Sequence, residues 1–333
     1  MKKIFSALLM LTMLLLVACG GKTEEKAPAA KAETSGLKVG IVLSTGGLGD
    51  KSFNDSAYRG LEKAKAELGV DFKYVEPASP SEDEQFLREY ADAGYDLIIA
   101  TGFQMTKAAE KVAKDYPNIK FAMIDDVINA TNVKSLIFKE NEGSFLAGAA
   151  AAMASKTGVI GFVGGIEVPL IQKFEKGYNE GAKYVNPNIK VINIYVGGQN
   201  PFNDPVKGKE IALSEIKQGA DVIYQAAGGT GIGVIDAAKE SKVFAIGVDS
   251  NQDDVAPGTV LTSMLKNVDV AVFETVKAVK EGTFKPGIQE FGVKENGVGL
   301  TDFKNTKDAI GEENIKKLDA IKADISFGKI IVK

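Results

Sequence analysis

The feature that most constrains the fold is an alternation of short apolar runs with longer amphipathic stretches, which begins near Leu37 and starts again after Asn141. In 56–68, apolar side chains recur at the helical spacing, whereas the apolar run 38–43 has the length of a buried strand. Strands that alternate with helices form parallel βαβ units, and two consecutive sets of them predict two doubly wound sheets. We therefore expect an α/β fold with two domains of similar construction.

The alternation gives a list of expected elements. The expected strands are 38–43, 72–75, 97–100, 121–124 and 133–138, then 159–163, 191–196, 222–226, 243–247 and 260–264. The expected helices are 56–68, 82–93, 106–116, 142–155, 170–184, 206–218, 234–239 and 269–281, and the tail adds a strand at 289–293 and a helix at 306–320. Because the tail follows a complete second set, we expect the chain to return to the first domain and then to cross again. The domains are accordingly expected to span 37–138 with about 267–290, and 139–266 with about 291–333.

The N-terminal segment predicts the compartment. The positively charged residues Lys2 and Lys3 precede the apolar stretch 4–17, which is shorter than the roughly 20 residues that a membrane span needs. The segment Leu16-Val17-Ala18-Cys19 resembles the lipobox of bacterial lipoproteins, in which cleavage before the cysteine leaves a lipid-bearing N-terminus. We expect 1–18 to be a lipoprotein signal peptide, Cys19 to be lipidated, and 19–36 to be a flexible tether. The folded part would then be anchored to the cell membrane and face the periplasm or the extracellular side.

Composition excludes several classes of function. The 333 residues include no histidine and one cysteine, which excludes a Ser-His-Asp triad, an imidazole metal ligand, an intramolecular disulfide and a CxxC zinc site. With 40 basic and 44 acidic side chains, the formal charge is −4, so no basic surface for nucleic acid is indicated. Chemistry by carboxylates, lysine or tyrosine stays possible on composition alone. We expect no catalytic residues, no metal and no nucleic-acid partner.

Ligands bind at the carboxyl ends of strands in open parallel sheets, so the residues that directly follow the expected strands are candidates. After the first strand, 44–55 combines glycines with Asp50, Phe53 and Asn54. Glycines let the backbone approach a ligand, and Ser52 or Asn54 has the side chain of a helix cap. Phe53 is a large apolar residue in a polar loop. It either contacts a ligand or packs against the following helix as a hydrophobic staple.

Similar loops follow later strands. The adjacent carboxylates Asp125 and Asp126 point in different directions, so that one can face a cleft while the other caps a helix or faces solvent. The loop 197–204 again places one aromatic side chain, Phe202, among glycines and polar residues. Phe53 and Phe202, one from each domain, are therefore candidates to hold a flat ring between them, and such stacking contributes about 1–3 kcal/mol per base.

The glycine-rich segment 226–233 lies between a strand and a helix, which suggests a nucleotide cofactor. It lacks the GxGxxG spacing, although Asp249 follows about twenty residues later, as in dinucleotide-binding folds. We disfavour a dehydrogenase, because the segment lies deep in the chain and NAD is not available outside the cell membrane. Asp249 can instead accept hydrogen bonds from two hydroxyls of a ribose or another vicinal diol, and Lys266 can donate to the same hydroxyls and pair with that carboxylate. The alternative for both residues is a surface charge near a strand end.

Six ordered segments together resemble the basic membrane protein (BMP) family, the PnrA-like, purine-nucleoside-binding lipoproteins of bacterial ABC importers. These segments are DKSFND (50–55), EGSFLAGAAAA (142–152), FxKGYNEGA (174–182), AAGGTGIG (226–233), GVDSNQ (247–252) and TSMLKNVD (262–269). The resemblance extends from Leu37 to the C-terminus. It implies a type I periplasmic-binding-protein fold, in which the ligand binds between two Rossmann-like domains joined by a three-strand hinge. It also implies a binding protein rather than an enzyme, with no cofactor.

The resemblance further implies a role for each candidate residue. The base would stack between Phe53 and Phe202, although Phe174 competes with Phe202 as the second aromatic residue. The other implied residues are Asp50 and Asn54 at the base end, Asp125 at the polar edge of the base with Asp126 as the alternative, Gly228 at the sugar through its backbone, and Asp249 and Lys266 at the ribose hydroxyls.

The sequence therefore predicts a monomeric lipoprotein that captures a purine nucleoside, namely guanosine, inosine or adenosine, and delivers it to an ABC permease. Only the resemblance points to a nucleoside. Two alternatives stay open: the same fold with a sugar or another small ligand, and a surface receptor or adhesin without a role in transport. Sugar sites commonly stack tryptophan on the ring, and the absence of tryptophan from the chain weakens the first alternative.

Overall fold

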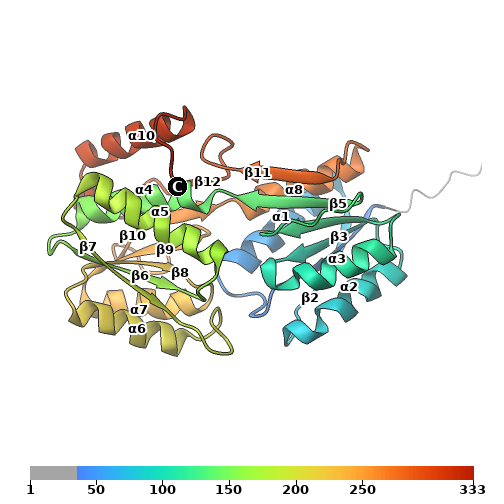
Figure 1. Cartoon of the computed structure of the whole chain (residues 1–333), viewed down its shortest axis with the longest axis horizontal. Coiled ribbons are helices and arrows are strands. Elements are labelled where there is room, and N and C mark those ends of the chain that lie inside the picture. Colours follow the sequence, from blue (N-terminus) through green and yellow to red (C-terminus); the bar gives the residue numbers. More distant parts are fainter. Residues whose placement is uncertain (1–35) are drawn as a thin grey trace, which may run out of the picture. The chain divides into compact units, whose positions relative to one another are not determined.

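The computed structural model describes residues 36–333, which form one compact unit. The predicted signal peptide 1–18, Cys19 and the predicted tether up to residue 35 lie outside the described residues. Two six-stranded sheets organise the described part of the chain (Figure 1). None of the helices in 36–333 combines the length and the apolar character that crossing a membrane requires.

The first lobe is the half that is built on the first sheet. Its strands are β1 (Lys38–Val42), β2 (Asp71–Val75), β3 (Leu97–Thr101), β4 (Lys120–Ile124), β5 (Val133–Phe138) and β11 (Gly287–Phe291). Its helices are α1 (Phe53–Leu68), η1 (Pro80–Glu82), α2 (Asp83–Asp92), η2 (Phe103–Met105), α3 (Thr106–Asp115) and α8 (Val268–Lys280). The strands are parallel, in the order β11–β5–β4–β3–β1–β2.

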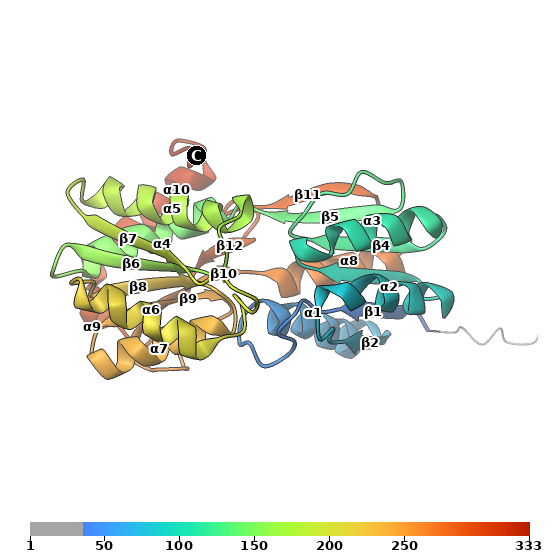
Figure 2. The same ribbon diagram turned by 60° about the horizontal axis from the view of Figure 1, so that its bottom comes forward.

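Both faces of the first sheet are covered by helices (Figure 2). Leu97 and Ile99 of β3 belong to the apolar core shared with α1 and α8, whereas Ile98 and Ala100 belong to the core shared with α2 and α3. Successive side chains of a strand point to opposite faces, so a strand covered on both sides is apolar along its whole length.

The second lobe is built on the second sheet in the same way. Its strands are β6 (Val159–Gly164), β7 (Lys190–Tyr195), β8 (Val222–Ala226), β9 (Phe244–Asp249), β10 (Val260–Lys266) and β12 (Val298–Leu300). Its helices are α4 (Glu140–Ala154), α5 (Pro169–Val185), α6 (Pro205–Lys217), α7 (Thr230–Ser241), α9 (Lys307–Ile310) and α10 (Glu312–Ser326). The order is β12–β10–β9–β8–β6–β7, and β12 alone runs antiparallel to its neighbour. In Figure 1, α4 and α5 lie above this sheet and α6 and α7 lie below it.

Small residues allow the helices α4 and α5 to approach each other closely. A Cβ atom at Gly148 would lie 2.0 Å from the carbonyl oxygen of Tyr178, and one at Gly181 would lie 1.9 Å from that of Phe145. The alanine-rich sequence of α4 therefore serves the contact with α5 as well as the contact with the sheet.

The chain passes between the lobes three times: from β5 to α4, from β10 to α8, and from β11 to β12. The predicted α/β fold with two doubly wound domains is confirmed. The lobes are joined at these three crossings, and each crossing leads directly out of a strand.

Three differences from the expected elements stand out: the start of α7, the division of the tail helix and the strand β12. Helix α7 begins at Thr230 rather than at residue 234, because the glycines of this segment permit contact with α6: a Cβ atom at Gly233 would lie 1.8 Å from the carbonyl oxygen of Pro205. The tail helix expected at 306–320 is divided into α9 and α10 by Gly311, whose φ of 79° lies in the left-handed region. The three-residue strand β12 was not predicted.

Candidate ligand-binding cavity between the lobes

A cavity lies between the carboxyl ends of the strands of both sheets, where the loops of the first lobe face those of the second. Every residue that the sequence singled out for ligand binding lines this cavity. These residues are Asp50, Phe53, Asn54, Asp125, Phe202, Gly228, Asp249 and Lys266. The structure thus brings together side chains from loops that lie far apart in the sequence.

Asp50 caps the N-terminus of α1. Its carboxylate accepts hydrogen bonds from the backbone N–H groups of Ser52, Asn54 and Asp55, at 2.8, 2.8 and 3.2 Å. Ser52, one of the two expected caps, occupies the N-cap position, but its side chain makes no capping bond, and Asn54 lies within the helix. The Asp50 carboxylate instead satisfies several free N–H groups and complements the positive end of the helix. Burial raises the pKa of Asp50, while these N–H donors act in the opposite direction. The cap fixes Phe53, the first residue of α1, at the cavity wall.

Two other polar side chains of this loop also have defined partners. The Asn54 Oδ1 atom accepts hydrogen bonds from the backbone N–H group of Ser44 at 3.0 Å and from its hydroxyl at 2.9 Å. The Ser52 hydroxyl donates to the Asp249 carboxylate of the second lobe at 2.5 Å. The Asn54 bonds therefore tie the end of the loop to its beginning, and the Ser52 bond ties the loop to the opposite lobe.

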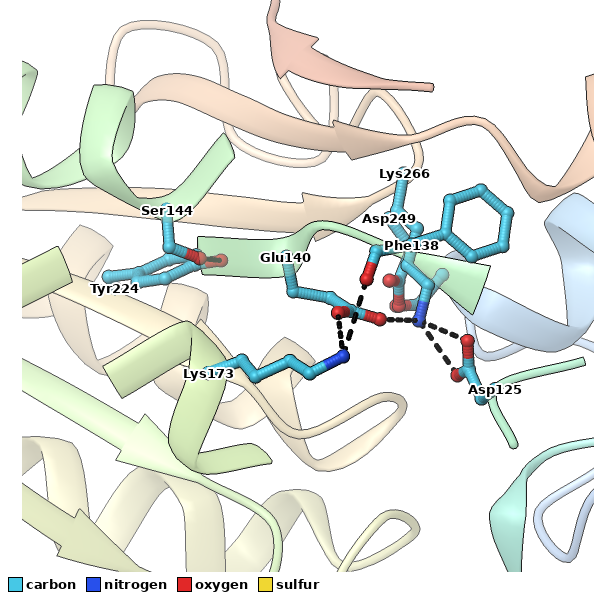
Figure 3. Close-up of polar contacts among 9 residues, drawn as sticks. Asp125, Phe138, Glu140, Ser144, Lys173, Tyr224, Asp249 and Lys266 are labelled. Atoms are coloured by element: carbon cyan, nitrogen blue, oxygen red, sulfur yellow. Dashed lines mark hydrogen bonds and ion pairs between the residues drawn. The ribbon is translucent and has the colours of Figure 1, made fainter. Parts of the chain in front are cut away.

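The Lys266 ammonium lies at the end of β10 and is almost fully buried, with 2% of the side chain exposed. It lies 2.6 Å from Asp125 Oδ1 and 3.0 Å from Glu140 Oε1 (Figure 3). The ion pair expected between Lys266 and Asp249 is not formed. Asp249 instead accepts the bond from Ser52, and Lys266 joins a carboxylate of the first lobe to one at the crossing between the lobes. Lys266 and the carboxyl groups of Asp125, Glu140 and Asp249 thus form a charged cluster at and behind the cavity wall.

Burial and mutual repulsion change the pKa values in this cluster. Burial raises the pKa of Asp249 to about 7, and the Lys266 ammonium and the Ser52 hydroxyl offset only part of this rise. Burial raises the pKa of Asp125 to about 6, with Lys266 again acting in the opposite direction. Burial alone would lower the pKa of Lys266, but the surrounding carboxylates, Asp125 first among them, outweigh it and hold that pKa above its ordinary value. Lys266 is therefore a permanent cation, whereas Asp249 changes protonation near neutral pH.

Two of the three aspartates that line the cavity share an unusual backbone conformation. Asp125 has a φ of 73° and Asp249 a φ of 60°, both in the left-handed region, and each residue ends a strand of a different lobe. Aspartate tolerates this region better than most residues because its short side chain can hydrogen-bond locally. Such conformations are found preferentially at functional sites, where the surrounding structure maintains them.

Four phenylalanines line the cavity: Phe53, Phe103, Phe174 and Phe202. Phe53 and Phe202 come from opposite lobes and are partly exposed, whereas Phe174 is 3% exposed and belongs to the apolar core. Phe103 contacts Phe202 edge to face, with the ring centres 6.5 Å apart. The Phe202 ring covers the backbone of Gly165, where a Cβ atom would lie 2.2 Å from it. Phe53 and Phe202 therefore present more ring surface to the cavity than Phe174 does.

Asp126 lies beside Asp125 but has a different role. It accepts hydrogen bonds from the Thr106 hydroxyl at 2.7 Å and from the Val127 N–H group at 2.8 Å, and it does not line the cavity. Its side chain therefore fixes the start of α3.

Two residues of the site were missed by the sequence analysis, although a signal for each was present. Phe103 directly follows β3, and Glu140 closely follows β5. The same argument from strand ends that identified the other loops points to both positions. Glu140 does not line the cavity but contacts Lys266 from behind it.

Comparisons with known proteins agree on the class of this chain. A family model described as ABC transporter substrate-binding protein PnrA-like matches residues 37–333. An uncharacterized lipoprotein of Pyrococcus abyssi is 39% identical, over 92% of this chain and 79% of its own length. The ABC transporter nucleoside-binding protein BmpA of Lactococcus lactis subsp. cremoris is 35% identical, over 98% of this chain and 97% of its own.

The structural comparison gives the same result. The crystal structure of an ABC transporter solute-binding protein from Aeropyrum pernix superposes with a TM-score of 0.82 and 32% sequence identity. The superposition covers 89% of this chain and 94% of that chain. Both lobes therefore have the type I periplasmic-binding arrangement that the resemblance implied.

Proposed function

Because this chain belongs to the family of PnrA-like substrate-binding proteins of ABC transporters, we propose that it captures a purine nucleoside between its lobes and delivers it to an ABC permease. Proteins of this family bind a solute for transport, so the chain is a binding protein and not an enzyme. Guanosine, inosine and adenosine are the proposed ligands.

One observation carries the proposal: the cavity combines aromatic rings with charged and polar groups, which match the two parts of a nucleoside. Phe53 and Phe202 offer ring faces from opposite lobes, and a purine is a flat ring that stacks on such faces. Asp249 and Lys266 offer an acceptor and a donor, which is what a pair of ribose hydroxyls requires. The name of the Lactococcus relative, a nucleoside-binding protein, supports the same ligand class.

In this proposal each cavity residue has one role. The base stacks between Phe53 and Phe202, and Asp125 accepts a hydrogen bond from its polar edge. Asp50, which also caps α1, and Asn54 lie near the base. The Gly228 backbone approaches the sugar, and Asp249 and Lys266 bind the ribose hydroxyls.

Transport requires that the protein remain close to the permease, and a lipid on Cys19 would provide this. The name of the Pyrococcus relative, a lipoprotein, supports such an anchor on the outer side of the cell membrane. We propose that the chain acts as a monomer, with 37–138 and 267–290 moving as one body against 139–266 and 291–333 about the three crossings. Cys19→Ala should shift the protein from the membrane fraction to the soluble fraction, and retention in the membrane would exclude this anchor.

Calorimetry tests the ligand. Residues 36–333 should be unfolded and refolded to remove bound ligand, and then titrated with purine and pyrimidine nucleosides, free bases, ribose and common sugars. We expect one purine nucleoside to bind per chain, with the free base and ribose both much weaker because each makes only part of the proposed contacts. Binding of a sugar but of no nucleoside would leave the assigned fold unchanged and would identify a sugar, rather than a nucleoside, as the ligand. If none of these compounds binds, the result would favour a receptor or adhesin.

A further inference from the structure

Glu140 is a buried carboxylate next to the cavity that has no role in the proposal above. It is the first residue of α4, directly after the crossing from the first lobe, and its side chain is fully buried. One carboxylate oxygen lies 3.0 Å from the Lys266 ammonium, and the other lies 3.3 Å from the Lys173 ammonium of α5 (Figure 3). The four charges Lys173, Glu140, Lys266 and Asp125 thus form a continuous row from the surface to the cavity.

The location of these groups on the two lobes distinguishes the partners of Lys266. Asp125 belongs to the first lobe, whereas Glu140 belongs to α4, which packs on the second lobe together with Lys266 itself. When the lobes move apart, Lys266 separates from Asp125 but keeps Glu140. Of the two ion pairs, only the one with Glu140 can therefore persist in an open state.

Glu140 also determines which carboxylate the ammonium approaches within the second lobe. Lysine has a flexible side chain that turns readily toward any nearby anion. Asp249 is close enough to raise the pKa of Lys266, but the two form no ion pair, and Lys266 lies against Glu140 and Asp125 instead. Asp249 consequently keeps acceptor capacity for a ligand.

We propose that Glu140 is a positioning residue, which holds the Lys266 ammonium at the cavity wall and away from Asp249 so that a diol can bind to both. This inference rests on the proposed nucleoside ligand and deepens it. Lys173 supports Glu140 from the outer side, where it also donates a hydrogen bond to the carbonyl oxygen of Phe138 at 3.4 Å.

The first test compares two ligands that share a base. In Glu140→Gln, affinity for the ribonucleoside should fall about tenfold, the magnitude expected for a disturbed hydrogen bond to a charged group. Affinity for the 2′,3′-dideoxynucleoside, which lacks the diol, should stay unchanged. Glu142→Gln is the matched control, because Glu142 lies on the same helix and bonds to Val293 rather than to Lys266. Equal losses for both ligands would mean that Glu140 is only structural, and no loss for either would remove its role altogether.

The second test needs no ligand and therefore separates this inference from the proposed function. The buried Lys266 ammonium should give a slowly exchanging ¹H–¹⁵N signal in the wild-type protein, identified by its absence in Lys266→Met. Glu140→Gln should shift or broaden that signal. Lys173→Gln, which changes a side chain that is 42% exposed and so preserves the fold, should have a smaller effect in the same direction. A signal unchanged in both variants would overturn the inference even if nucleosides bind, and a lost signal would support it even if they do not.

Discussion

Two buried regions of this protein hold carboxyl groups away from water in different ways. Around Lys266, the carboxyl groups of Asp125, Glu140 and Asp249 lie near one ammonium, and two of them form ion pairs with it. Glu215 of α6 is also fully buried, but neither of its side-chain oxygens has a hydrogen-bond partner. The first region lines the cavity or lies directly behind it, and Glu215 does not.

The difference shows how a buried carboxyl group avoids an uncompensated charge. It either pairs with a cation or keeps its proton. Burial raises the pKa of Glu215 to about 9, and the nearby backbone of Phe162 offsets only part of this rise. Glu215 is therefore neutral at pH 7 and occupies space next to Gly161, where a Cβ atom would lie 2.2 Å from its carboxyl oxygen. Burial by itself does not identify a site, whereas an ion-paired cluster that opens into a cavity does.

Removal of the ammonium should have the largest effect. Lys266→Met keeps the apolar stem but leaves Asp125 and Asp249 without a cation and Glu140 with Lys173 alone, which should lower the free energy of unfolding by about 3–5 kcal/mol at pH 8. The loss should be smaller at pH 5, because the carboxyl groups can then take up protons. Urea unfolding at both pH values measures this difference. A loss below about 1 kcal/mol at pH 8 would mean that the cluster does not depend on its ammonium.

The opposite result is expected in the second region. The pKa of Glu215 is about 9 in the folded protein and 4.5 as the ordinary value, so wild-type stability should fall as the pH rises from about 4.5 to 9. Glu215→Gln does not titrate and should be more stable than the wild type by about 2 kcal/mol at pH 7, with no gain at pH 4. Glu210→Gln is the control on the same helix, because that side chain is 63% exposed. A variant that is less stable than the wild type at pH 7 would show that Glu215 has a partner.

The sheets could be predicted from the sequence because their signal is local. The central strands β1, β3 and β4 of the first lobe are short apolar runs, and α1 is followed by Gly69, whose φ of 65° lies in the left-handed region that favours glycine. The start of α7 could not be predicted, because the glycines at 231 and 233 are helical for a tertiary reason, the contacts with Gln225 and with Pro205 of α6. Glu215 lies in a helix whose existence was predicted, but its burial depends on the packing of that helix on β6.

The cavity residues could be predicted one by one but their pairing could not. Strand ends identify Asp125, Asp249 and Lys266 as candidates, since ligands bind there in parallel sheets. Lys266 and Asp125 are 141 positions apart and belong to different lobes, so their ion pair depends on how the lobes meet. Glu140 also follows a strand end, but its role depends on its contacts with Lys173 and Lys266, which come from other elements and cannot be inferred from local sequence.

The smallest effect, a change in the slope of stability against pH, is expected where both kinds of compensation meet, at Asp249. Its pKa is about 7 in the folded protein and 3.8 as the ordinary value, so it should lower wild-type stability as the pH rises from about 4 to 7. Asp249→Asn fits the left-handed backbone, with its φ of 60°, and removes up to about 1.4 kcal/mol per pH unit from that slope. Above about pH 8 its slope should match that of the wild type, since Asp249 is then ionised in both the folded and the unfolded wild-type protein, and only Glu215 of these two groups still titrates. Unfolding curves at one-unit pH intervals measure both windows, and an unchanged slope below pH 7 would assign the titration to another carboxyl group of the cluster.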